Sequence, residues 1–492
     1  MTKQLKEGLM NYKKYFLDLD FDLEEKKYDG KVKIFLDLKK KINKLDLDSV
    51  DLDIKRVKVN DKEIRFEIEK GKLIIKGNFL FSNLIEIDFE GKLIEKLGGI
   101  YLSKYKEANQ DKYIITTQFE PIDARTAFPC YDHPNFKSVF QVKLAFPKEL
   151  IAVSNTLPLK EETNNSKKTV IFKETPRMST YLLYFGIGDF EFLSGKYKNI
   201  LIRIVTTKGK KEGGKFALDV TKKFLNYFEN FFGYHYPLEK LDLIAIPDFA
   251  SGAMENWGAI TFRENLLLHF EGISPSATKL VKAEVIAHEL SHMWFGNLVT
   301  MKWWDDLWLN ESFATYLAYK AVDKYFPKWE IMKDYLLDET ISGMSRDVLN
   351  STHPIKVKIR DPNESQEIFD EISYDKGGSV LRTLNLYLGE KDFKNGLKNY
   401  IRKFKYGNAK AEDLWLAIQE KSKAPVIKIM TDFITKPGTP IVYLKEKNNK
   451  YYLEQKRFTL HEDKNTIWSL PLFLKVNNRS QKFLLNKRIV KL

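Results

Sequence analysis

The fold and chemistry of this chain are decided by residues 285–295, VIAHELSHMWF. Residues four apart lie on the same face of an α-helix, so His288 and His292 can present their imidazoles to one metal ion. Glu289 stands beside them, at a position from which its carboxylate can take a proton from an attacking water molecule. The stretch therefore predicts a helix that carries two metal ligands and a general base.

A third ligand is expected from a second helix. A catalytic zinc site needs three protein ligands and one open position, and Glu311 begins another helical pattern after Trp304-Asp305-Asp306-Leu307-Trp308-Leu309-Asn310. Two imidazoles and one carboxylate suit zinc better than calcium or magnesium, although cobalt or manganese could occupy the same site. We therefore expect one Zn²⁺ per chain, held by His288, His292 and Glu311, in the arrangement typical of metalloproteases.

The sequence before this region has a period of two. Apolar and polar positions alternate in most of the strands that we expect here. These strands cover residues 31–38, 64–68, 84–89, 139–146 and 181–185. This pattern predicts strands with one buried face. We expect residues 1–195 to form an all-β N-terminal domain.

After residue 195 the period changes to that of helices. Residues 216–231 place aromatic and aliphatic side chains on one helical face, and helical patterns dominate from residue 280 to about residue 436. Pro437-Gly438-Thr439-Pro440 then ends the helices, and alternating strands return. We expect a mixed α/β catalytic domain over residues 196–440 and a short β domain over residues 441–492, which makes a multidomain α+β protein.

Composition excludes several classes of protein. The 492 residues carry a formal net charge of +14, but the basic residues are mostly lysines scattered among 67 acidic ones, which is typical of a solvated surface and argues against nucleic-acid binding. The single cysteine, Cys130, excludes an internal disulfide. Because no apolar run is long enough for a membrane span or a secretory signal, we expect a cytoplasmic protein that does not enter membranes.

A further motif lies at residues 252–256, Gly-Ala-Met-Glu-Asn. With the metal helix, it makes the sequence resemble the aminopeptidase N family of zinc aminopeptidases, among the gluzincins. The resemblance runs from about Gly99 to Pro440 and includes residues 117–121, 123–125, 127–132, 303–311, 351–355 and 372–382. It implies a saddle-like N-terminal β domain, a thermolysin-like catalytic domain and a C-terminal β-sandwich.

The resemblance also assigns roles to residues. Glu255 is expected to bind the free α-ammonium group of a peptide substrate, with Glu120 as its companion and Gln118 at the border of the pocket for the first side chain. Tyr374 is expected to donate a hydrogen bond to the oxyanion of the tetrahedral intermediate. The remaining residues of the substrate-binding set are Gly252, Ala253, Met254 and Asn256, and the backbone near the first two would pair with the peptide as an added strand.

The sequence departs from long family members at its C-terminal end. Those continue into a large helical domain, whereas this sequence stops at Leu492 within a strand-like run. We expect an incomplete β-sandwich whose edge is covered in a homo-oligomer or by a separate polypeptide.

The leading hypothesis is a zinc-dependent aminopeptidase that acts on peptides with a free N-terminus. Three alternatives stay open. They are a catalytically weak, zinc-stabilised interaction protein, an endopeptidase, and an epoxide hydrolase of the leukotriene type from the same superfamily.

Overall fold

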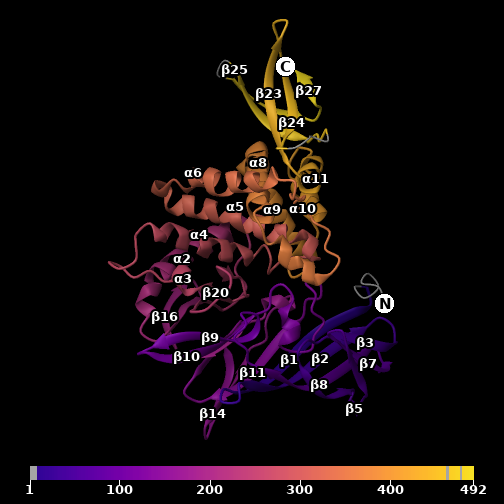
Figure 1. Ribbon diagram of the computed structural model, residues 1–492, viewed down its shortest axis with the longest axis vertical. Coiled ribbons are helices and arrows are strands. Elements are labelled where there is room, and N and C mark those ends of the chain that lie inside the picture. Colours follow the sequence, from indigo (N-terminus) through magenta and orange to yellow (C-terminus); the bar gives the residue numbers. More distant parts are fainter. Residues whose placement is uncertain (1–7, 461–464, 477–478) are drawn as a thin grey trace. The chain divides into compact units, whose positions relative to one another are not determined.

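The computed structural model describes residues 8–460, 465–476 and 479–492 (Figure 1). By the packing of its Cα atoms the chain divides into two units. Unit 1 comprises Met1–Leu225 and Tyr236–Glu289, and unit 2 comprises Asn226–His235 and Leu290–Leu492. The division passes through two continuous helices, α2 (Lys215–Phe232) and α4 (Thr278–His292). The boundaries expected near residues 195 and 440 were inferred from changes of sequence pattern, which this division does not test, and they stay a prediction.

An eight-stranded sheet dominates the N-terminal part of unit 1, in the indigo and purple part of Figure 1. Its central strand β1 pairs antiparallel with β2 and parallel with β11. Buried and more exposed positions alternate along these strands, as the sequence predicts for a sheet with one face in the core. The strand order is β13 (Pro158–Asn164), β14 (Lys167–Phe172), β11 (Val139–Pro147), β1 (Met10–Asp22), β2 (Lys27–Leu38), β8 (Ser82–Lys92), β4 (Asp53–Val59) and β5 (Lys62–Glu63).

Two smaller sheets complete this β region. Their orders are β12 (Ile151–Ser154), β15 (Phe185–Gly188), β10 (Gln110–Gln118) and β9 (Gly99–Glu107), and β3 (Ile42–Asp48), β7 (Lys72–Phe79) and β6 (Phe66–Glu69). The strand expected at residues 181–185 is wrong, because a 3-10 turn covers Thr180–Leu182 and β15 begins only at Phe185. The side chain of Asn155 gives the reason: its amide bonds the Leu182 carbonyl oxygen and the Tyr184 N–H in place of a neighbouring strand.

A five-stranded mixed sheet forms the rest of the β structure of unit 1. Its order is β16 (Phe190–Tyr197), β17 (Ile200–Thr207), β18 (Lys240–Ile246), β20 (Ala259–Arg263) and β19 (Ala253–Met254). All seven residues of β18 are buried, as is typical of a parallel strand covered on both faces. The short strand β19 is an edge strand, and the Gly-Ala-Met-Glu-Asn motif passes through it.

Unit 2 is helical up to about residue 435. Its helices are α5 (Trp308–Tyr325), α6 (Ile331–Tyr335), α7 (Ser342–Asp347), α8 (Gly377–Leu388), α9 (Glu390–Phe404), α10 (Ala411–Gln419) and α11 (Val426–Thr435). Phe295, which follows α4, stacks on Phe313 of α5 and on Tyr400 of α9 at ring distances of 4.4 and 5.3 Å. Among the described residues, no helix combines the length and apolar character that crossing a membrane requires.

Shorter elements link the longer ones. The short helix α3 (Glu264–Leu267) follows β20, and the two-residue strands β21 (Thr300–Met301) and β22 (Asn408–Ala409) pair in parallel. Single 3-10 segments cover Asp123–Thr126, Thr180–Leu182, Lys211–Gly214, Trp304–Asp306, Pro327–Trp329 and Pro362–Ile368, and π-helical turns cover Leu336–Ile341 and Ile372–Lys376.

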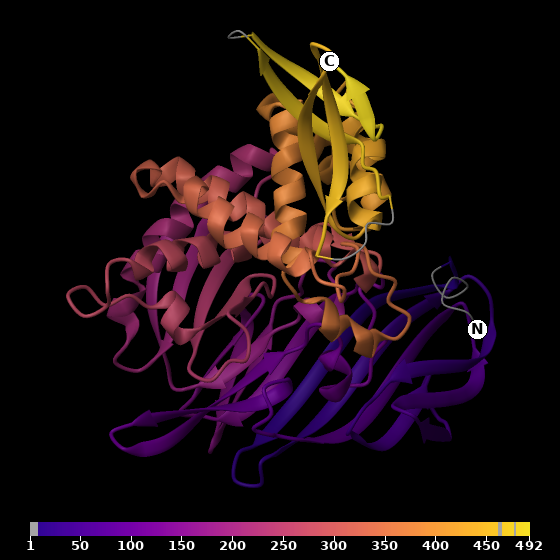
Figure 2. The ribbon, with the colours of Figure 1, turned by 45° about the horizontal axis from the view of Figure 1, so that its top comes forward.

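The C-terminal strands of unit 2 form a three-stranded sheet and a hairpin, drawn in yellow beside the orange helices in Figure 2. They are β23 (Thr439–Lys447), β24 (Lys450–Phe458) and β27 (Ile489–Lys491), and β25 (Leu470–Val476) and β26 (Arg479–Leu485). The side chain of Gln455 ties them together, because its amide bonds the backbone of Trp468 and Leu485. Leu444 is 66% exposed, and the expected covering chain stays a prediction.

Candidate active site

Helix α4 carries three of the predicted site residues. His288, Glu289 and His292 all fall within its continuous span, so one helical turn separates the two imidazoles. Glu289 and His292 are buried, with exposed fractions of 6% and 1%, although both are polar. With His288 one turn before His292, these side chains make this end of α4 a candidate site for a metal ion.

The ring of His292 is oriented by the loop that follows the helix. Its Nδ1 lies 3.0 Å from the carbonyl oxygen of Phe295, and because a carbonyl only accepts, Nδ1 must carry the proton. Nε2 is then left with the lone pair that a metal ion requires. The loop needs a glycine at position 296. The φ of Gly296 is +127°, which side chains disfavour, and a Cβ there would lie 3.3 Å from Nδ1 of His292.

Glu311 brings the third donor from the first turn of α5. Its side chain is buried, and its Oε2 lies 3.6 Å from Nε2 of His292. His288, His292 and Glu311 each offer one ligand atom, and these atoms lie within 4.8 Å of one another. Two imidazole nitrogens and one carboxylate oxygen are the donor set of a catalytic zinc site, so the residues present fit that ion.

Unit 1 gathers acidic side chains around Glu255. Its carboxylate, 3% exposed, lies within 4.8 Å of a carboxylate oxygen of Glu289 and of one of Glu120. Burial in a low dielectric disfavours several adjacent negative charges unless a cation joins them. This cluster therefore suits a positively charged ligand group next to the metal helix.

The loop after Glu255 is fixed by two buried side chains that the sequence did not reveal. Nζ of Lys240 donates to the carbonyl oxygen of Gly258 at 2.6 Å and to Asp242 at 2.7 Å. Nδ2 of Asn155 donates to the carbonyl oxygen of Trp257 at 2.9 Å. Burial lowers the pKa of Lys240 to about 8, against the attraction of Asp242. Lys240 begins the largely apolar strand β18, and its charge at that position is the only sign in the sequence that it holds this loop.

Gln118 and Asn256 each bury an amide oxygen. Gln118 ends β10, two residues before Glu120, and Asn256 directly follows Glu255. Neither side-chain oxygen has a hydrogen-bond partner within the part of the chain that the structure describes. Nδ2 of Asn256 donates to the hydroxyl of Thr261 on β20, which fixes its orientation. Both oxygens are available to accept from a ligand.

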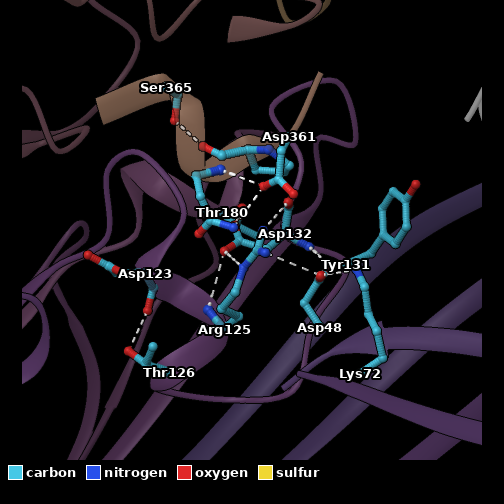
Figure 3. Close-up of polar contacts among 12 residues, drawn as sticks. Asp48, Lys72, Asp123, Arg125, Thr126, Tyr131, Asp132, Thr180, Asp361 and Ser365 are labelled. Carbon is cyan, nitrogen blue, oxygen red and sulfur yellow. Dashed lines mark hydrogen bonds and ion pairs between the residues drawn. The ribbon is translucent and has the colours of Figure 1, made fainter. Parts of the chain in front are cut away.

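A buried ion network holds the segment that follows Glu120 (Figure 3). Arg125 donates from Nε to Asp132 at 3.0 Å and lies 3.4 Å from Asp48 of β3. The second carboxylate oxygen of Asp132 accepts from the hydroxyl of Thr180 at 2.7 Å. This network anchors the 3-10 segment Asp123–Thr126 to the β region and so restricts the chain next to Glu120.

Gly252, Ala253 and Met254 lie along the edge of the mixed sheet. Ala253 and Met254 pair with Phe262 and Thr261 of β20, and the Gly252 carbonyl oxygen accepts from the N–H of Arg263 at 2.8 Å. Because β19 ends the sheet, its other side has no strand partner among the described residues. An extended peptide can add to such an edge.

Tyr374 occupies the π-helical turn Ile372–Lys376 at the start of α8. Its side chain is half-buried. The turn packs on α5, the helix of Glu311, through a hydrogen bond of 2.6 Å from the hydroxyl of Ser312 to the carbonyl oxygen of Ser373. The backbone of Tyr374 thus lies next to the helix of a predicted ligand, and the role of its hydroxyl stays a prediction.

Comparison with known proteins identifies the family. The peptidase family M1 domain matches residues 216–433, and the peptidase M1 N-terminal domain matches residues 11–182. The chain belongs to peptidase family M1.

Relatives with assigned names match nearly the whole chain. A probable aminopeptidase 2 of Sulfurisphaera tokodaii is 46% identical over 482 residues, which are 97% of this chain and 60% of the relative. A leucyl aminopeptidase of Saccharolobus solfataricus is 43% identical over 481 residues, with the same coverage. Tricorn protease-interacting factor F2 of Thermoplasma acidophilum is 43% identical over 465 residues, which are 93% of this chain and 58% of the relative. The chain thus spans about 60% of the length of these relatives.

Proposed function

We propose that this chain is a zinc-dependent aminopeptidase that hydrolyses the N-terminal peptide bond of peptides. The observation that carries the proposal is the position of Glu255, whose carboxylate lies within 4.8 Å of those of Glu120 and Glu289. An anchor for an ammonium group beside the predicted general base allows cleavage only near the amino end of a peptide. The names of the relatives support the same activity.

In this proposal His288, His292 and Glu311 hold the metal ion. Zinc, when bound, lowers the pKa of water and polarises a carbonyl group. Glu289 accepts the proton of the attacking water and passes it to the leaving nitrogen, a task that its burial beside the two imidazoles supports.

The other residues position the substrate and stabilise charge. Glu255 and Glu120 accept hydrogen bonds from the α-ammonium group, and charge-assisted bonds of this kind fix the first residue strongly. The edge strand β19 pairs with the peptide backbone, while Gln118 and Asn256 each offer a buried acceptor oxygen. Tyr374 donates to the carbonyl oxygen of the scissile bond as negative charge develops there.

A panel of aminoacyl anilides, leucyl anilide among them, tests the proposal. We expect hydrolysis by the wild type, loss of hydrolysis after chelation with recovery on adding zinc, and a fall in kcat of roughly 10²-fold or more for Glu289→Ala. Bound zinc without hydrolysis of any anilide would favour the interaction protein. Turnover of N-acetylated peptides at the rate of free ones would favour the endopeptidase, and turnover of a leukotriene-type epoxide alone would favour the epoxide hydrolase.

A further inference from the structure

Ser312 links the chain next to Glu311 with the chain next to Tyr374, two predicted site residues of unit 2. It directly follows Glu311 on α5 and is fully buried. Its hydroxyl donates to the carbonyl oxygen of Ser373 at 2.6 Å, and Ser373 directly precedes Tyr374. One hydrogen bond thus joins the neighbour of a predicted metal ligand to the neighbour of the predicted oxyanion donor.

The packing around this bond is unusually close. A Cβ at Gly377 would lie 1.9 Å from Oγ of Ser312, and one at Gly378 would lie 2.7 Å from the hydroxyl oxygen of Tyr335. Gly377 has an ordinary helical φ of −59°, so backbone conformation does not require a glycine there. Glycine within a helix costs about 1 kcal/mol relative to alanine. We attribute the glycine at position 377 to the space that the side chain of Ser312 needs.

The same turn is also held at both of its ends. Oδ1 of Asp370 accepts from the N–H groups of Ile372 and Ser373, at 3.1 and 3.2 Å, and Oδ2 lies 2.7 Å from Nε2 of His353. At the last residue of the turn, Nζ of Lys376 lies 3.0 Å from the buried carboxylate of Asp347. Both ends of the turn are therefore fixed. The hydrogen bond from Ser312 then sets the position of the turn along α5.

We propose that Ser312 is a positioning residue that sets the place of Tyr374 relative to Glu311. The inference rests on the role proposed for Tyr374. The hydroxyl of Ser312 is fully buried, and it acts by holding the backbone at Ser373. Because a displacement of about 1 Å in a catalytic group can cost 10²-fold in rate, losing this bond affects kcat more than substrate binding.

A double-mutant cycle with Ser312→Ala and Tyr374→Phe tests this. We expect Ser312→Ala to lower kcat roughly tenfold or more, with KM changed less than about twofold and zinc content unchanged. In the Tyr374→Phe background the same change should have little further effect, because the group that Ser312 positions is already gone. Ser312→Ala should also weaken binding of a phosphinic peptide analogue, measured by calorimetry, because its tetrahedral anion needs the same donor.

Ser179→Ala is the matched control. Ser179 is equally buried and donates to the carbonyl oxygen of Pro134 at the same distance of 2.6 Å, but it lies in the β region of unit 1. We expect it to leave kcat unchanged. Gly377→Ala disturbs the contact from the opposite side and should lower kcat in the same way.

The outcomes separate the two proposals. If Tyr374→Phe keeps full kcat, the role of Tyr374 is wrong and the positioning role goes with it. If Tyr374→Phe is slow but the effects of the two substitutions multiply, the proposed function stands and the inference on Ser312 is overturned. Loss of zinc from Ser312→Ala would also overturn it, because the serine would then act through Glu311.

Discussion

Glu255→Gln tests the amine anchor most directly. The substitution keeps the size of the side chain and removes the charge, while the buried loop contacts of Lys240 and Asn155 with the backbone after it remain. A hydrogen bond to a charged group contributes about 1.5–3 kcal/mol, which corresponds to roughly 10- to 150-fold in kcat/KM for leucyl anilide. Glu120→Gln should act in the same direction. The double variant should fall short of the product of the two effects, because both carboxylates bind one ammonium group.

The assay compares two inhibitors, a substrate-like peptide analogue with its α-amino group and the same compound without it. In Glu255→Gln the inhibition constant of the first should rise by the factor seen in kcat/KM, and that of the second should stay the same. Glu174→Gln serves as control, because it removes a charge from a largely exposed pair with Lys14 in the same unit. Equal weakening of both inhibitors, or of neither, would refute the anchor.

Three further predictions concern metal binding, pH and stability. Gly296→Ala places a side chain at φ +127° and 3.3 Å from Nδ1 of His292, so zinc affinity should fall roughly 10- to 100-fold in a chelator competition. The pKa of His353 is raised by its hydrogen bond to Asp370, and that bond lowers the pKa of Asp370 despite burial. The pair should therefore stabilise the fold most between about pH 4 and 6.5 and less above and below, a dependence that His353→Gln removes in urea titrations. Asp242→Ala should lower the free energy of unfolding by about 3–5 kcal/mol, because two cations lose their buried partner.

Each of these has a clear contrary result. Unchanged zinc affinity in Gly296→Ala would show that the loop does not orient His292. The same urea midpoints for His353→Gln and wild type across the pH range would exclude the stabilising pair. If the free energy of unfolding of Asp242→Ala is within about 0.5 kcal/mol of the wild-type value, as for an ordinary surface substitution, the buried ion pairs of Asp242 do not stabilise the fold.

Local sequence pattern predicted several of the longer strands and helices and the candidate metal ligands. Alternation predicted the long strands β2, β8 and β11, and helical spacing predicted that His288 and His292 share a face of α4. Such patterns are readable because they depend on residues within a few positions of one another. The strand expected at residues 181–185 was wrong, because the side chain of Asn155, distant in sequence, supplies the hydrogen bonds there.

Only the tertiary structure decided how those donors are held. The contact between Ser312 and Ser373, the reach of Lys240 to Gly258, and the closeness of Glu120 to Glu255 all join residues that lie far apart in the chain. Among these partners, the family resemblance marked only Glu120 and Glu255, because a buried serine or lysine cannot be told from any other in the sequence until its neighbour is known. The sequence thus predicted the candidate metal ligands and the general base, and packing determined the distances between them.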